Sequence, residues 1–263
     1  MLPAFFPEEL EMSAGSAQPV ASGTAQPAEI SQQEFLQHMN AMQQHHRAID
    51  PTAASHLIKP YLLPAHLILA LPHIPADAGT KPAVPQAQHS AGNPAFKESA
   101  ARTVPMLARL VTIGTPRPAA QLMSAALEDQ HKRLRALVDH HRAALSKAVT
   151  AARHPKSTQT FAQQMNALRE ATKTDHRARI DAMFASFTAI GTAHPAARRV
   201  ILDTGNKVAT FGAGVAGGAS HVIATVTSAV AAGGSASAKA ADTVGKWASS
   251  ATHSVEHFFS SLF

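Results

Sequence analysis

Residues 208–238 read VATFGAGVAGGASHVIATVTSAVAAGGSASA, a run of 31 residues without Asp, Glu, Lys or Arg. The run lies between Lys207 and Lys239 and consists mostly of Ala, Gly, Val, Ser and Thr. A helix that faces water normally carries charged residues along its outer side. This segment is therefore expected either to be buried against protein or to bind a membrane, and most of the functional interpretation depends on that choice.

The apolar residues in and after this run recur at a helical spacing. Val222, Val226 and Val230 lie four residues apart, which places them on one face of a helix. A second apolar stripe occupies residues 244–262. The glycines of the run weaken a helix by about 1 kcal/mol each relative to Ala. We nevertheless predict a Gly/Ala/Val-rich, amphipathic helical region over residues 195–263.

Two longer periodic runs precede this region and predict an independent antiparallel helical hairpin over residues 118–192. His154-Pro155 separates the runs, and Gly191 and Pro195 are expected to end the second. The buried face of the first helix would consist of Leu127, Leu134, Val138, His141, Leu145 and Val149. That of the second would consist of Phe161, Met165, Leu168, Thr172, His176, Ile180, Met183, Phe187 and Ile190.

The first part of the chain resists regular structure, because 15 of its 17 prolines lie at or before Pro118. Residues 1–30 are of low complexity and are predicted to be disordered. Residues 31–117 are predicted to hold one short helix and a Pro-rich irregular region. Ser31 and Glu34 have the spacing of a capping box, in which each side chain bonds a backbone amide of the other. The buried face of that helix would consist of Phe35, Met39 and Met42.

Charge is distributed unevenly along the chain. Residues 1–96 carry a net charge of −4, residues 97–200 carry +10, and residues 201–263 are neutral. A basic middle followed by an uncharged apolar region is typical of proteins that bind membrane surfaces, and it is compatible with nucleic-acid binding.

The sequence contains no Cys, so thiol chemistry is excluded. The acidic N-terminus, with Pro3 and Pro7, is not expected to act as a Sec signal peptide.

Gly212, Gly214 and Gly217 match the GxGxxG pattern, and KVATFGAGVAGG resembles the first turn of a dinucleotide-binding domain. The acidic residue that should follow a second strand about 20 residues later is missing, because that region reads AAGGSASAKAAD. A close helix contact through small residues, from Gly214 to Gly218, is the preferred interpretation. We expect no cofactor.

Several histidines are candidate metal ligands. His253, Glu256 and His257 match the HxxEH pattern of inverted zinc proteases, but a third ligand well downstream is missing, so we expect no metal. The adjacent pairs His45-His46 and His140-His141 cannot each chelate one ion, because neighbours on a helix point about 100° apart. On their apolar faces, His141 and His176 are interpreted as satisfied core histidines, with a pH switch as the alternative.

Residues 208–245 resemble in composition the Gly/Ala/Val/Thr segments of synucleins and perilipins, which form long helices on lipid surfaces. The overall layout is similar to type III secretion translocators and effectors, and to the internal virion proteins that short-tailed phages eject. These likenesses imply a surface helix on lipid and, for the layout, an exported protein. They assign no role to any single residue, since the KTKEGV-type repeat is absent.

We therefore predict a mostly α, non-enzymatic, membrane-associated protein, exported without a cleavable signal peptide and acting as an effector or translocator. Its partner would be an anionic lipid surface. The membrane-binding residues would be Arg198, Arg199, Val208, Phe211, Val215, Val222, Val226, Val230, Val244, Trp247, Val255, Phe258, Phe259 and Leu262. The alternatives are a soluble scaffold or virion protein, whose C-terminal region is buried against helical partners or copies of itself, and a nucleic-acid-binding protein. Nucleic acid is disfavoured, because residues 97–160 lack stacking aromatics.

Overall fold

The computed structural model describes residues 29–53, 58–68, 107–111, 114–152, 158–233 and 235–261. Within these ranges the chain forms helices and no strand, which confirms the predicted mostly α fold. The main helices are α1 (Gln32–Ala48), α3 (Arg117–Ala151), α4 (Thr158–Ala193), α5 (Arg198–Ala232) and α6 (Ser235–Ser261). The described chain also contains two short 3-10 turns, η1 (Ala65–Leu67) and η2 (Pro195–Ala197), and a short helical segment at residues 107–111.

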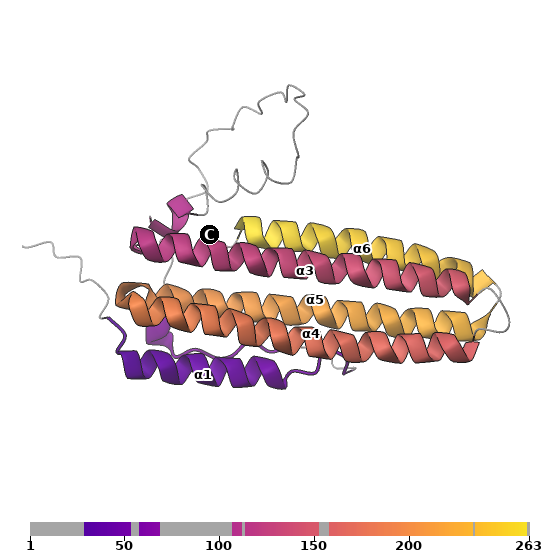
Figure 1. The fold of residues 1–263 in the computed structure, drawn as a ribbon, viewed down its shortest axis with the longest axis horizontal. Coiled ribbons are helices and arrows are strands. Elements are labelled where there is room, and N and C mark those ends of the chain that lie inside the picture. The colour runs from indigo at the N-terminus through magenta and orange to yellow at the C-terminus, as the bar shows by residue number, and fades with distance from the viewer. Residues whose placement is uncertain are drawn as a thin grey trace, which may run out of the picture.

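The four long helices α3, α4, α5 and α6 form an antiparallel bundle in which each successive helix reverses direction (Figure 1). Each helix packs on the next, and α6 closes the ring by packing on α3. The shorter helix α1 lies outside this ring, against α4 and α5. As a result, α5 contacts every other main helix and is the most enclosed element of the fold.

Helix α1 shows why the sequence folds as predicted at this point and where it departs from the prediction. The Ser31 hydroxyl accepts a hydrogen bond from the Glu34 backbone amide at 3.1 Å, and Phe35, Met39 and Met42 are buried, as predicted. The Glu34 carboxylate does not complete the capping box. It lies 2.9 Å from His66 Nε2, and so joins the start of α1 to η1.

The predicted faces of α3 and α4 are confirmed, since every residue assigned to them is buried. The predicted break at Gly191 and Pro195 is confirmed, because α4 ends between them at Ala193, although Gly191 itself still lies within the helix. Gly191 instead allows the Phe35 ring of α1 to lie against the α4 backbone, where a Cβ at this position would overlap the ring. The predicted break at His154-Pro155 lies outside the described residues.

Helix α5 ends at Gly233, whose φ of 69° lies in the left-handed region that glycine tolerates best. The buried residues form two clusters, and each cluster includes residues from both α3–α4 and α5–α6. The two pairs of helices therefore share one continuous interior. The predicted disorder of residues 1–30 falls outside the described residues apart from Glu29 and Ile30, as does most of the Pro-rich region.

Candidate functional site

The residues predicted to bind membrane face the interior of the bundle. Among those that the structure describes, Phe211, Trp247 and Phe258 are half-buried. Fully buried are Val208, Val215, Val222, Val226, Val230, Val244, Val255 and Phe259. Phe211 of α5 and Phe258 of α6 stack with parallel rings whose centroids are 3.9 Å apart. Leu262 lies outside the described residues.

Arg198 is engaged within the protein rather than displayed on its surface. Its side chain is 6% exposed, and Nε donates to the Gly191 carbonyl at 2.9 Å while Nη1 donates to the Ile30 carbonyl at 2.8 Å. The guanidinium carbon also lies 5.8 Å from the centroid of the Phe35 ring. Arg198 therefore ties the start of α1 to the end of α4. Its neighbour Arg199 is half-buried.

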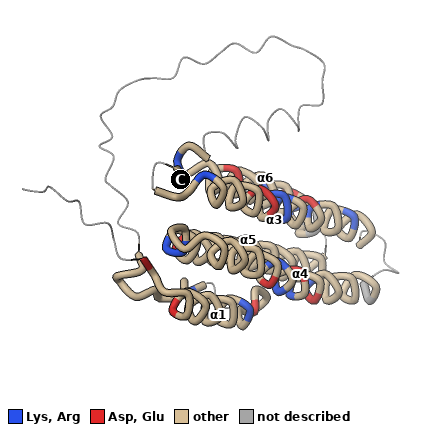
Figure 2. The backbone as a smooth tube through the Cα atoms, turned by 60° about the vertical axis from the view of Figure 1, so that its left-hand side comes forward, with Lys and Arg blue, Asp and Glu red and all other residues tan. Residues whose placement is uncertain are grey.

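The outer stripe of α5 is narrow and carries no charge after Lys207. Between residues 208 and 230 the exposed positions are Gly214, His221, Thr225 and Ser228. Figure 2 shows this uncharged stretch of α5 in tan. Residues Pro195–Ala232 are long and apolar enough to cross a membrane, and 44% of their most apolar stretch is buried in the bundle. The core helix of a soluble protein passes the same test of length and composition.

Trp247 on α6 lies across the bundle interior between α5 and α3. Its ring makes an edge contact with the His141 imidazole, with centroids 6.4 Å apart. Gly218 of α5 faces its indole nitrogen, and a Cβ added to Gly218 would lie 3.3 Å from Nε1. Gly218 thus makes room for the indole, as predicted for a close helix contact. The prediction is wrong for Gly214, which is exposed and where a Cβ would meet nothing within 4 Å.

Three basic side chains, His46 on α1 and His176 and Arg179 on α4, are buried together; we call them the basic layer. None of the three is more than 1% exposed. His176 Nε2 donates to the His46 carbonyl at 3.0 Å, and Arg179 Nη1 donates to Gln130 Oε1 of α3 at 3.3 Å. The guanidinium lies against the α5 backbone at Gly212, where a Cβ would overlap it. The basic layer therefore joins α1, α3, α4 and α5.

Several polar atoms of the basic layer have no hydrogen-bond partner among the described residues. They are Nδ1 of His46, Nδ1 of His176, and Nε and Nη2 of Arg179. Burial lowers the pKa of His46 to about 4 and that of Arg179 to about 10, and burial also lowers the pKa of His176. At neutral pH both imidazoles are therefore neutral, while Arg179 remains charged. A buried charge with so little compensation destabilises the closed bundle.

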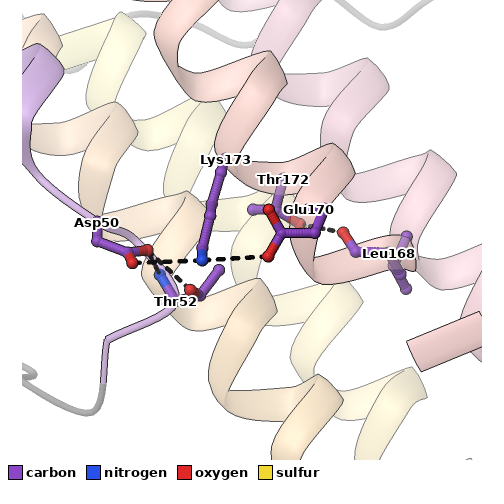
Figure 3. Close-up of polar contacts among 6 residues, drawn as sticks. All are labelled: Asp50, Thr52, Leu168, Glu170, Thr172 and Lys173. Carbon is purple, nitrogen blue, oxygen red and sulfur yellow. Dashed lines mark hydrogen bonds and ion pairs between the residues drawn. The ribbon is translucent and has the colours of Figure 1, made fainter. Parts of the chain in front are cut away.

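His141 on α3 is also buried, but both of its ring nitrogens have partners. Nδ1 lies 2.8 Å from the Leu137 carbonyl, and Nε2 lies 2.7 Å from the Thr172 hydroxyl of α4. Figure 3 shows that the same hydroxyl reaches the Leu168 carbonyl, at 2.8 Å. Burial lowers the pKa of His141 as well. This arrangement matches the satisfied core histidine that the sequence predicts.

An exposed polar cluster fastens the segment after α1 to α4 (Figure 3). Lys173 Nζ lies 3.4 Å from Asp50 Oδ2 and 3.2 Å from Glu170 Oε1. Asp50 Oδ1 accepts from the Thr52 backbone amide at 2.8 Å and from its hydroxyl at 2.7 Å, which closes a tight turn. Together with the hydrogen bond from Gln43 to Asp181, this cluster holds α1 on α4.

The two motif matches have structural explanations. Gly212, Gly214 and Gly217 lie in the middle of α5 with no preceding strand in the described chain, so they do not form a dinucleotide-binding turn. Glu256 pairs with Arg135 and His131 of α3, whereas His253 and His257 are exposed. In the part of the chain that the structure describes, no group of three or more His, Asp or Glu residues could hold a metal ion.

Sequence reasoning identified His46 and His176 but missed Arg179, Gln130 and Asn206 as parts of the same buried region. Asn206 on α5 accepts from His46 and exchanges hydrogen bonds with the Tyr61 backbone. The position of Arg179 carried a signal, because it follows His176 by three residues and precedes Met183 by four on the apolar face of α4.

Comparison of the chain with protein-family models, curated proteins and solved structures gives no match. The basis for a functional proposal is therefore the residues of this chain and their contacts.

Proposed function

We propose that this chain is a non-enzymatic, membrane-associating protein whose bundle opens at an anionic lipid surface and places the apolar faces of α5 and α6 in the bilayer interface. The observation that carries the proposal is the charge-free run of 31 residues, most of which forms the most enclosed helix of the bundle. A helix that only had to remain soluble would gain from charges on its outer stripe, and this one has Gly214, His221, Thr225 and Ser228 there.

Because these faces are closed in the bundle, binding requires an exchange of partners. Val222, Val226 and Val230 would leave the neighbouring helices for lipid, which is similarly apolar, so the exchange has a small net cost in buried area. Lys246, an exposed residue beside Trp247, would contact anionic headgroups while its stem stays on apolar surface. Arg198 would contribute only after its contacts with Gly191 and Ile30 break.

The requirement for opening makes the proposal testable with a covalent lock. The chain has no native Cys, so Phe211→Cys and Phe258→Cys can be joined across α5 and α6 with a short thiol cross-linker, since these rings stack in the bundle. A second lock would join α3 to α6 through Arg135→Cys and Glu256→Cys, which are paired in the structure. We expect the unlocked chain to float with vesicles containing phosphatidylglycerol. Each of the two locked chains should show reduced flotation.

Each single-Cys variant treated with the same cross-linker serves as the control for the lock. If the chain with α3 fixed to α6 floats as well as its controls, opening between these helices is excluded as the route to lipid. If no form of the chain binds vesicles of any charge, membrane association itself is overturned.

A soluble helical scaffold is the second candidate, and one observation favours it. The described residues predicted to bind lipid already have partners within the chain, so the apolar run can be satisfied without a membrane. The nucleic-acid alternative gains less support, since Arg133 pairs with Asp129 and Arg135 with Glu256 on the basic helix α3. An unchanged Trp247 emission spectrum on mixing with vesicles would favour the scaffold.

A further inference from the structure

The hydrogen bonds of the basic layer determine which ring nitrogen of each histidine carries the proton. The His46 carbonyl can only accept, so His176 Nε2 carries the proton of the neutral ring, and the buried Nδ1 is its bare nitrogen. A second proton on His176 would therefore occupy Nδ1, where no acceptor lies among the described residues. Among the charged groups of the same helix, the Arg179 guanidinium acts most strongly on His176, and it repels an added proton.

His46 also has one ring nitrogen with a hydrogen-bond partner, on α5, and one without. Asn206 Nδ2 donates to the Tyr61 carbonyl at 2.7 Å, which fixes the orientation of the amide and leaves Oδ1 as the acceptor. His46 Nε2 therefore donates to Oδ1 at 3.0 Å, and its Nδ1 is buried and bare. A second proton on His46 would again have no acceptor.

His141 provides an internal contrast. If its ring gained a proton, Nδ1 would keep donating to the Leu137 carbonyl and Nε2 would donate to the Thr172 hydroxyl. That hydroxyl can donate in turn to the Leu168 carbonyl, so every hydrogen bond is retained. A proton on His141 would therefore leave no ring nitrogen without a partner, whereas a proton on His46 or His176 would.

The charges around the basic layer do not compensate added protons. The single carboxylate that acts on His176 and Arg179 is Asp175 on α4, which is exposed. The other titratable groups that face the layer are basic: His45 on α1, Arg133 on α3 and Arg177 on α4. From α5 the layer meets the neutral amide of Asn206, which is held in turn by the Tyr61 backbone.

We propose that the basic layer is an acid-sensitive clasp: protonation of His46 and His176 beside Arg179 releases α1 from α4 and α5, and thereby frees the bundle to open. The membrane step that follows rests on the proposed function above, but the release of α1 does not. The direction follows from linkage, because both imidazoles bind protons more readily when released than when buried. Each one raises the equilibrium constant for release by up to about tenfold per pH unit of acidification.

The test uses the full chain without lipid and measures amide hydrogen exchange of α1 between about pH 7.5 and pH 4.5, corrected for the intrinsic rate. The double variant His46→Gln/His176→Gln keeps an amide donor near each Nε2 and removes both titrations. We expect α1 of the parent chain to lose protection on acidification and α1 of the double variant to keep it. His141→Gln is the matched control and should open at the same pH as the parent.

Equal acid release in the double variant and the parent would overturn the clasp, as would an equal shift produced by His141→Gln. If the double variant does not fold, Arg179→Met replaces it. This change keeps the aliphatic stem, removes the repelling charge, and should move release to lower pH; an unchanged release pH would count against the clasp. Flotation with phosphatidylglycerol vesicles at both pH values tests the membrane step separately, because its failure leaves the lipid-free result standing.

Discussion

The two ends of the bundle differ in the side chains that they bury. At the end that α1 covers, large side chains such as Phe35, Phe184 and Phe187 pack together with the basic layer. At the opposite end, the interior consists of residues such as Phe161 and Val226, with small Ala and Val side chains from α5 and α6. Both buried arginines, Arg179 and Arg198, lie at the α1 end. Apolar packing therefore holds one end, while the other also depends on the charge state of its interior.

The largest expected effect tests whether a buried apolar residue stabilises each of the two ends. Leu134→Asp places a carboxylate in the cluster at the α1 end, and Met165→Asp places one in the cluster at the opposite end. Each should lower the free energy of unfolding by about 4 kcal/mol, because a buried unpaired charge is left without solvation. The exposed substitutions Ala136→Asp and Gln164→Asp are the controls. Thermal unfolding followed by circular dichroism would contradict these assignments if the buried and exposed changes cost the same.

A slightly smaller effect is expected from acidification, which should destabilise the α1 end of the bundle through His46. The pKa of His46 is lowered from 6.5 to about 4 in the folded chain, chiefly by burial. The unfolded chain therefore binds more protons between these values, and the stability contributed by the neutral ring is present above pH 6.5 and lost as the pH falls toward 4. For His46 alone this loss amounts to about 3 kcal/mol. Urea unfolding at about pH 7.5 and pH 4.5 should show it, and His46→Gln should show a correspondingly smaller loss.

The third prediction compares two glycines that are two residues apart on α5. Gly212→Ala forces a methyl group into the Arg179 guanidinium and should destabilise the bundle by about 1–3 kcal/mol. Gly214→Ala meets nothing within 4 Å and should stabilise it by up to about 1 kcal/mol through helix propensity. Urea denaturation measures both changes. Combining Gly212→Ala with Arg179→Met should recover most of the loss, and additive effects would show that the two residues do not interact.

The smallest effect concerns the beginning of α1. Ser31→Ala removes the hydroxyl that accepts from the Glu34 amide and should cost about 1 kcal/mol. Because this end of the bundle is the one that α1 covers, hydrogen exchange should rise first in α1, with little change near Met165. Uniform loss of protection along the chain would show instead that α1 cannot detach separately from the rest.

The helices and their buried faces could be predicted from the sequence, because a helical period of apolar residues is a local property. Residues such as Leu134, Met165 and Val226 show that period clearly and are all buried. The partner of each face is not a local property. The charge-free run was expected to meet protein or lipid, and only the folded arrangement shows it enclosed by α1, α3, α4 and α6.

The errors and omissions have the same origin. Gly191 reads as a helix breaker, yet it lies within the last turn of α4, where its missing side chain leaves space for the Phe35 ring of a distant helix. Glu34 reads as half of a capping box, yet it pairs with His66. Arg179 was overlooked because arginine is usually exposed, and its burial depends on Gln130 and Gly212 being brought together by the fold.

The connectivity of the bundle has a consequence for how quickly it can reassemble. Each long helix packs on the helix that follows it in sequence, and the α5–α6 joint is a turn at Gly233. Most contacts therefore form between neighbouring segments, so little chain entropy is lost before they form, and helical folds of this kind refold in microseconds to milliseconds. The contacts of α3 with α5 and α6 and the docking of α1 bring more distant parts of the chain together. If the bundle opens as we propose, it should therefore close again far faster than it could diffuse to an aggregation partner at low concentration.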